Sequence, residues 1–112
     1  MASPTQRTLN EARKLGYIAA VVEKWIPQTR QRKDLFGFVD VLCLRGPNTL
    51  AIQATSGSNH SARVAKIKAS ENLPAMLAAG WVVEVWSWKK TGPRGAVKRW
   101  TCRKEAIVMG AA

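Results

Sequence analysis

Two neighbouring apolar stretches decide the fold of this chain: FGFVDVLCL at residues 36–44 and LAIQAT at residues 50–55. Both are rich in β-forming residues, and the sequence RGPN between them, at residues 45–48, is a turn signal. They predict a hairpin with strands at about 35–44 and 49–55. Each strand also carries a polar residue that its apolar neighbours do not explain, Asp40 in the first and Gln53 in the second.

The chain after this hairpin has the pattern of a crossover connection. SGSN at residues 56–59 ends the second strand and offers N-caps for a helix from about residue 61. Pro74 predicts a break near Asn72, and Gly80 should end a second helical piece that reaches Ala79. A strand rich in Val and Trp follows at 81–88. A strand, helix and strand in this order predict parallel pairing with a right-handed crossover.

The two ends of the chain complete the predicted topology. TLNE at residues 8–11 matches a capping box with Thr8 as N-cap, and Gly16 suits the C′ position of a helix over 8–16. A strand is expected at 17–25, a polar loop at 28–33, and a last strand at 97–108 after the turn TGPRG. The sequence thus predicts one α/β domain over residues 1–112. Its order is αβββαββ, with a mixed sheet of about five strands flanked by helices.

The charge balance limits the class of partner. Eighteen Lys and Arg against seven Asp and Glu give a net charge of +11, which attracts polyanions. No long amphipathic basic helix favours lipid, so nucleic acid is the expected partner. The longest apolar runs are far shorter than the roughly 20 residues of a membrane span, so no membrane association is expected. With no apolar leader and two cysteines set far apart in apolar stretches, a cytoplasmic protein with reduced thiols is expected.

The polar residues of the hairpin point to a metal site. Burying a carboxylate such as that of Asp40 costs on the order of several kcal/mol unless it is paired or binds a cation. A structural alternative is an aspartate at a strand end that bonds to nearby backbone. Gln53 and Thr55 are two residues apart and share one face of their strand, so both can meet Asp40 across the hairpin. A carboxylate beside an amide oxygen is a hard oxygen pair that suits Mg²⁺.

These residues resemble the signature of PD-(D/E)xK nucleases, in which a metal-binding Asp on one hairpin strand is followed by Glu-x-Lys on the next. The likeness in element order covers residues 8–88, and the strings DLFGFVD at 34–40 and QATS at 53–56 are similar to small phage-borne and Holliday-junction-resolvase-like members. The resemblance implies a restriction-endonuclease-like core and an endonuclease that uses Mg²⁺ or Mn²⁺ on DNA, including branched or junction DNA. It also implies a homodimer in a bacterial cell or a phage-infected host. The chain has no Gly-rich loop for a nucleotide or another small-molecule cofactor.

The departures from that signature keep a second function open. Gln53 stands where the family has Glu, which weakens cation binding, and Thr55 stands where it has Lys. Lys66 or Arg63, on the following helix, can supply the missing positive charge. Otherwise the domain is a catalytically degenerate module that binds DNA without cutting it.

The remaining acid of the site has two candidates. Glu23 lies in an apolar strand and is preferred over Glu11, whose capping box already accounts for it. The catalytic set that the resemblance implies is therefore Asp40, Gln53, Thr55, Glu23 and Lys66, with Asp40, Gln53 and Glu23 or Glu11 as metal ligands. Asp34, beside Lys33, is interpreted as a solvated loop residue or a salt-bridge partner.

Basic residues outside the hairpin predict where DNA is contacted. Seven Lys and Arg fall within residues 89–104 with no acid among them. Trp86 and Trp88 precede this stretch and Trp100 lies within it, and we assign most of these tryptophans to the core. His60 has no evident partner acid and is assigned to a helix start. The predicted DNA-binding residues are Arg30, Arg32, Lys33, Arg63, Lys66, Lys68, Lys89, Lys90 and Arg94.

Overall fold

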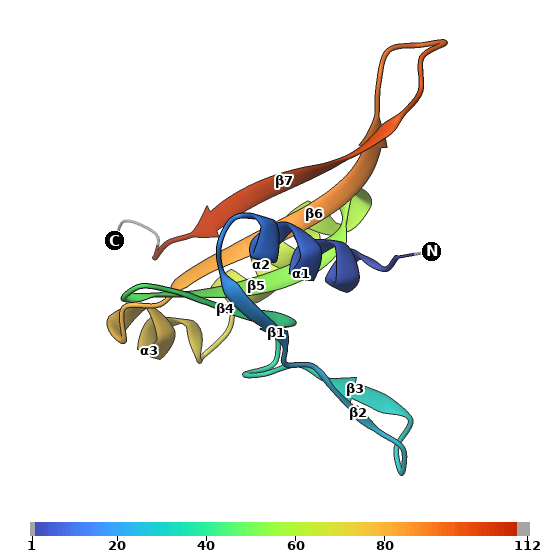
Figure 1. The fold of residues 1–112 in the computed structure, drawn as a ribbon. Helices are drawn as coiled ribbons and strands as arrows, with labels where there is room; N and C mark the ends of the chain where they lie inside the picture. The colour runs from blue at the N-terminus through green and yellow to red at the C-terminus, as the bar shows by residue number, and fades with distance from the viewer. Residues whose placement is uncertain (1, 110–112) are drawn as a thin grey trace.

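The computed structural model describes residues 2–109 and shows a mixed α/β fold, with a five-stranded mixed sheet and helices on both of its faces (Figure 1). The strand order is β1-β4-β5-β6-β7, and a separate two-stranded sheet is formed by β2 and β3. The elements are α1 (Pro4–Lys14), β1 (Ile18–Val21), β2 (Lys24–Ile26), β3 (Gln31–Lys33), β4 (Val41–Arg45), β5 (Asn48–Ser56), η1 (Gly57–Asn59), α2 (His60–Lys68), α3 (Leu73–Ala78), β6 (Val82–Thr91) and β7 (Arg99–Ile107).

The sheet is covered on both faces because its central strands are apolar on both sides. Ala51 of β5 packs with Ile67 of α2 and Met76 of α3 in one buried cluster. The next residue along β5, Ile52, packs in a second cluster with Leu9 of α1. Adjacent residues of a strand point to opposite faces, so one strand serves both cores.

The predicted parallel pairing of the two strands that flank the helices is confirmed. β5 and β6 pair in parallel, with Gln53 opposite Val85, while the other neighbours in the sheet pair antiparallel. The helix α2 begins at His60, one residue before the expected start. α3 carries Pro74 in its first turn and ends before Gly80, whose φ of +86° is the left-handed conformation that glycine adopts readily.

The predicted start of the first helix is wrong. α1 begins at Pro4 with Ser3 as its N-cap, and the Ser3 hydroxyl accepts a hydrogen bond of 3.1 Å from the Gln6 backbone N–H. Proline is favoured in the first turn because its missing N–H would be unpaired there anyway, so this start is preferred over Thr8. Thr8 is instead buried inside α1, where its hydroxyl accepts a 2.9 Å hydrogen bond from the Trp88 indole.

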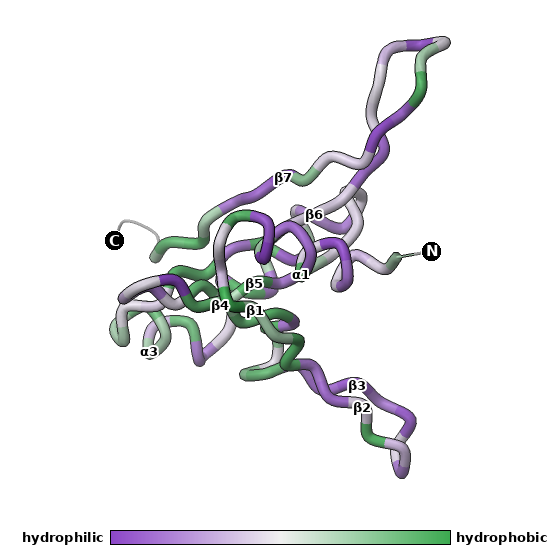
Figure 2. The backbone as a smooth tube through the Cα atoms, viewed as in Figure 1, coloured by the Kyte–Doolittle hydropathy of each residue, from purple (hydrophilic) through white to green (hydrophobic). Residues whose placement is uncertain are grey.

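The predicted strand over 17–25 is confirmed only for β1, because the chain leaves the main sheet after Val21. The Val22 N–H donates to the Asp40 carbonyl at 2.8 Å, and β2 then pairs with β3. The expected loop at 28–33 therefore contains a strand, β3. Figures 1 and 2 show this hairpin as a hydrophilic arm that extends from the body of the protein.

The first half of the predicted strand over 35–44 is a tight turn instead. Leu35 and Val39 form an isolated bridge around Phe36 and Gly37, both of which have positive φ, and β4 starts only at Val41. Phe38 and Val39 are nevertheless buried in the core. Their apolar character reflects burial and not strand pairing, so the prediction of a strand at these residues is wrong.

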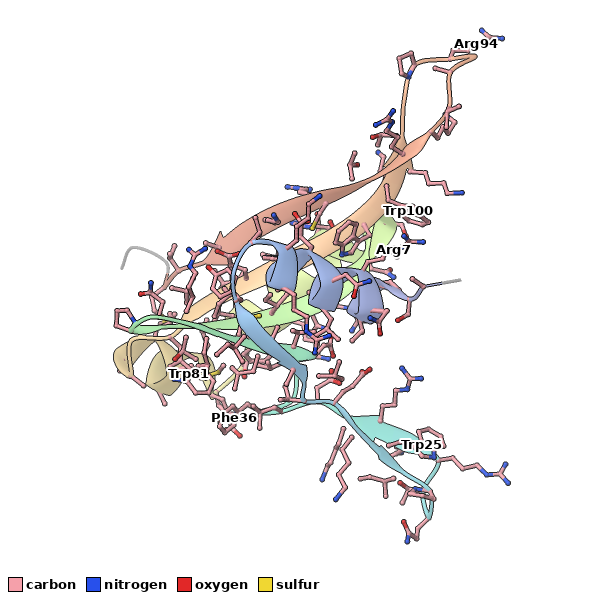
Figure 3. The ribbon with its side chains drawn as sticks, viewed as in Figure 1. Arg7, Trp25, Phe36, Trp81, Arg94 and Trp100 are labelled. Carbon is pink, nitrogen blue, oxygen red and sulfur yellow. The ribbon has the colours of Figure 1, made fainter. Side chains whose placement is uncertain are left out.

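The strands β6 and β7 form a second arm. Lys89 and Lys90 lie in the last part of β6, which pairs with β7 beyond the end of β5. Arg94 lies in the loop that joins the two strands (Figure 3). Trp86 and Trp88 are buried, as predicted for most of the tryptophans. Trp100 is 41% exposed, and the Arg7 guanidinium lies 3.8 Å from the centre of its ring.

A buried histidine fastens α2 to the sheet. His60 is 2% exposed; its Nδ1 lies 2.6 Å from the Ser87 hydroxyl, and its Nε2 lies 2.9 Å from a Glu105 carboxylate oxygen. The expectation that this histidine has no partner acid is therefore wrong, because Glu105 reaches it from β7. The hydrogen bond from His60 lowers the pKa of Glu105. A depressed carboxyl pKa stabilises the fold above the ordinary glutamate range, and this contribution is lost as the pH falls through the lowered pKa.

Replacing His60 with alanine should destabilise the protein by about 1–3 kcal/mol, because the buried Ser87 hydroxyl loses its partner. Urea unfolding followed by circular dichroism measures the change in free energy. Arg103→Gln is the matched control, since Arg103 donates to the same carboxylate at 3.4 Å from an exposed position. The control should cost no more than about 0.5 kcal/mol. Equal losses in the two variants would contradict the assigned importance of the histidine.

Candidate functional site

Asp40 occupies a buried position directly before β4. It is 4% exposed, and one carboxylate oxygen, Oδ2, accepts hydrogen bonds from the Gln53 side-chain Nε2 at 2.8 Å and from the Ala54 backbone N–H at 2.9 Å. The pairing of Val41 with Ile52 sets this geometry, because it places Asp40 opposite Gln53. The predicted meeting of Asp40 and Gln53 across the hairpin is confirmed.

Two further carboxylates lie beside Asp40. One oxygen each from Glu23, Asp34 and Asp40 lies within 4.8 Å of the others. The main-chain hydrogen bond from Val22 to Asp40 brings Glu23 in, and the turn between Leu35 and Val39 folds Asp34 back toward Asp40.

Glu23 thus lies beside Asp40, as predicted in preference to Glu11. It does so from the link between β1 and β2, and not from the continuous strand that was expected there. The interpretation of Asp34 as a solvated loop residue is wrong, since it is half-buried in this cluster. Its spacing of six residues from Asp40, across the Phe36-Gly37 turn, is the signal that could have indicated it.

The cluster has an unfavourable charge of its own. The pKa of Asp40 is raised to about 7, first by burial and then by the nearby charges of Asp34 and Glu23, while the Ala54 hydrogen bond opposes the shift. Arg32 lies 3.5 Å from Glu23 and offsets part of the negative charge. A site of this kind favours a bound proton or a bound cation.

Gln53 adds an uncompensated oxygen. Among the described residues, its Oε1 is a buried side-chain atom with no hydrogen-bond partner. The opposite orientation of the amide would set two acceptor oxygens against each other at Asp40, so the Nε2 contact fixes which way the amide points. An unsatisfied buried acceptor costs about 1–3 kcal/mol, and a cation coordinated by that oxygen removes this cost.

The carboxylates open into a cavity of about 420 Å³. Thr55, Asn59 and Arg63 line it from the end of β5 and the start of α2, so all members of the predicted trio of Asp40, Gln53 and Thr55 meet there. Arg32 and Arg63 are the cations among its lining residues, and Ser3, Pro4 and Thr5 place the N-terminal end of α1 at its edge. The cavity combines hard oxygen ligands with groups that attract anions.

No family model, curated protein or solved structure matches this chain.

Other predicted site residues lie elsewhere. Glu11 is not a lining residue of this cavity and forms an ion pair of 3.0 Å with Lys104. Lys66 is exposed on α2 and does not line the cavity, whereas Arg63, the other candidate for the missing charge, does.

The predicted DNA contacts fall into three groups. Arg30, Arg32 and Lys33 are on or beside β3, Lys68 ends α2, and Lys89, Lys90 and Arg94 follow the β6–β7 arm.

None of the helices in residues 2–109 has the length and apolarity needed to cross a bilayer.

Proposed function

We propose that this protein is a metal-dependent endonuclease that hydrolyses phosphodiester bonds of DNA on a restriction-endonuclease-like core. The observation that carries the proposal is a cluster of three carboxylates whose buried member, Asp40, is bonded by the Gln53 amide, an amide whose oxygen has no partner among the described residues. Three carboxylates and one amide oxygen, with the charge of Glu23 partly offset by Arg32, match the preference of Mg²⁺ or Mn²⁺ for hard oxygen ligands.

The residues divide into a cation-binding side and a phosphate-binding side. Asp34, Asp40, Glu23 and the Gln53 oxygen would hold the cation. When bound, such a cation lowers the pKa of a water nucleophile and stabilises charge on the phosphate.

The protein's own groups hold the substrate against that side. Arg63, on the first turn of α2, and Arg32, on β3, both line the cavity and offer guanidinium groups that bind phosphate oxygens in a fork. Arg63 occupies the role left open by Thr55, where the resemblance would place lysine. Fixed positive groups beside the cut bond stabilise the charge that develops on the phosphorus oxygens.

The positive charge of the rest of the chain supports a polyanionic substrate. Both hairpin arms are basic, and the net charge is +11. A clustered excess of cations is stabilised by phosphate contacts, whose strength depends on salt.

The direct test is incubation of the pure protein with plasmid, single-stranded and four-way-junction DNA in Mg²⁺ or Mn²⁺. We expect cleavage of at least one substrate with metal and none with EDTA. Binding measured in EDTA should weaken with salt by about 0.9 log units per log unit of salt for each phosphate neutralised.

The failures of this test are informative in different ways. Salt-dependent binding without cleavage of any substrate would overturn the endonuclease and favour the non-catalytic DNA-binding module. A flat salt response would exclude nucleic acid as the partner.

A further inference from the structure

The β2–β3 hairpin presents an aromatic ring that the fold does not use. Trp25, in the middle of β2, is 53% exposed (Figure 3). The hairpin is a separate two-stranded sheet, so Trp25 belongs to neither of the two buried clusters. Large exposed aromatic side chains are enriched at binding sites because they bury much area at little entropic cost.

The surroundings of this ring are cationic. Residues 24–33 contain Lys24, Arg30, Arg32 and Lys33 and no acid. All four are exposed. Four like charges on one short hairpin disfavour contact with a second copy of the same surface, whereas they attract a phosphate backbone.

Trp25 is also adjacent to the candidate site. It is the register partner of Arg32, and paired residues of antiparallel strands point to the same side, with Cα atoms about 4.5–5.5 Å apart. Arg32 lines the carboxylate cavity and lies 3.5 Å from Glu23. The indole therefore shares a face with a residue of the site.

We infer that Trp25 stacks on an unpaired base next to the phosphate that is cut, so that the substrate is DNA with unpaired nucleotides at the cleavage point. The inference rests on the proposed function. The reason is geometric: the faces of bases in continuous duplex are covered by their neighbours, so an indole stacks on a base only where the strand is single or opened. Arg32 then holds the phosphate while Trp25 holds the base, and the two contacts fix which bond enters the cavity.

The test compares binding of the full chain, in EDTA, to a fully paired duplex and to the same duplex with a central unpaired bubble. Fluorescence anisotropy of labelled DNA gives both affinities. We expect the wild type to prefer the bubble. Trp25→Ala should weaken bubble binding by about 5- to 150-fold, the range for one stacked base, and change duplex binding by less than about twofold.

Three variants separate stacking from other effects. Trp25→Phe keeps a ring and should retain most of the preference for the bubble. Lys24→Gln removes only a phosphate contact and should weaken both substrates alike. Val97→Ala removes an exposed apolar residue of the β6–β7 arm and should change neither.

Each result supports or overturns a distinct statement. Equal losses on bubble and duplex in Trp25→Ala, or no loss on either, would overturn the stacking role and leave the proposed function standing. A fall in the sedimentation mass of Trp25→Ala relative to the wild type would show that the ring is a contact between copies, which also overturns it. Absence of all DNA binding by the wild type would overturn the proposed function.

Discussion

Replacing Asp40 with asparagine is expected to slow cleavage strongly and, in the same variant, to raise the melting temperature near neutral and alkaline pH. Cleavage should fall by about a hundredfold or more, since the loss of a metal ligand removes about 3 kcal/mol or more of transition-state stabilisation. The gain in stability has a separate origin, the unfavourable charge of the buried carboxylate.

The pH dependence of that gain follows from the raised pKa of Asp40. Its folded value is about 7, against an ordinary value of 3.8. Between these values the folded protein holds a proton that the unfolded chain has released, so stability falls as the pH rises through this window. Above about pH 7 the full cost, at most about 4 kcal/mol, is present.

Asparagine fits the same position without a charge. Its side-chain oxygen can accept from Gln53 and Ala54, while its amide N–H groups can face the carboxylates of Asp34 and Glu23. We expect Asp40→Asn to melt roughly 5 °C or more above the wild type at about pH 8, and at the same temperature at about pH 4. Differential scanning calorimetry across this range measures both.

Added Mn²⁺ or Mg²⁺ provides a second measurement on the same variant. A cation that binds only the folded state raises the melting temperature of the wild type with its concentration, and Asp40→Asn should lose most of this response. Glu71→Gln, which removes an exposed acid between α2 and α3, is the matched control and should behave as the wild type. A variant that melts below the wild type at alkaline pH would contradict a destabilising carboxylate.

Local patterns were enough to predict the half of the fold that follows the hairpin. The bounds of β5 and the ends of α2 and α3 that were predicted are correct to within one residue, because Pro74 and Gly80 mark helix ends and β5 is a long apolar run; β6 continues to Thr91, three residues past its predicted end. The pairing of Asp40 with Gln53 was predictable for the same reason, since alternation along β5 and a four-residue turn leave little choice of register.

The parts that were missed depend on contacts that no local pattern encodes. The approach of Asp34 and Glu23 to Asp40 requires the chain to leave the sheet after Val21 and to turn back at Phe36. Glu105 lies 45 residues from His60. The sequence offers both Ser3 and Thr8 as N-caps of α1. The choice of Ser3 leaves Thr8 buried under Trp88, and that is a tertiary contact which no local pattern indicates.

The second large effect is expected from Gln53→Glu, which restores the acid that the resemblance places at this position. In the present chain the Gln53 amide donates to Asp40 at 2.8 Å and so holds a carboxylate in place without a cation. A glutamate there would set two carboxylate oxygens at that separation, a repulsion of roughly 6 kcal/mol at an effective dielectric constant of about 20, before proton uptake relieves it.

The variant should therefore depend on metal for its stability. In EDTA at about pH 8 we expect it to lose roughly 2–4 kcal/mol of unfolding free energy relative to the wild type, and to recover most of this with Mn²⁺. Its metal affinity should rise by about 10- to 100-fold, because a charged ligand replaces a neutral one. Urea unfolding with and without metal measures the first effect, and a thermal titration with Mn²⁺ the second.

Gln53→Met is the control that separates charge from shape. It keeps the volume but removes both the donor to Asp40 and the free oxygen, so it should be destabilised without rescue by metal. If Gln53→Glu has the same stability with and without EDTA, residue 53 does not contact a cation, and the unpartnered oxygen must be satisfied in another way. If metal rescues it as expected, glutamine at position 53 lowers the affinity for metal but keeps the protein stable when the cation is absent.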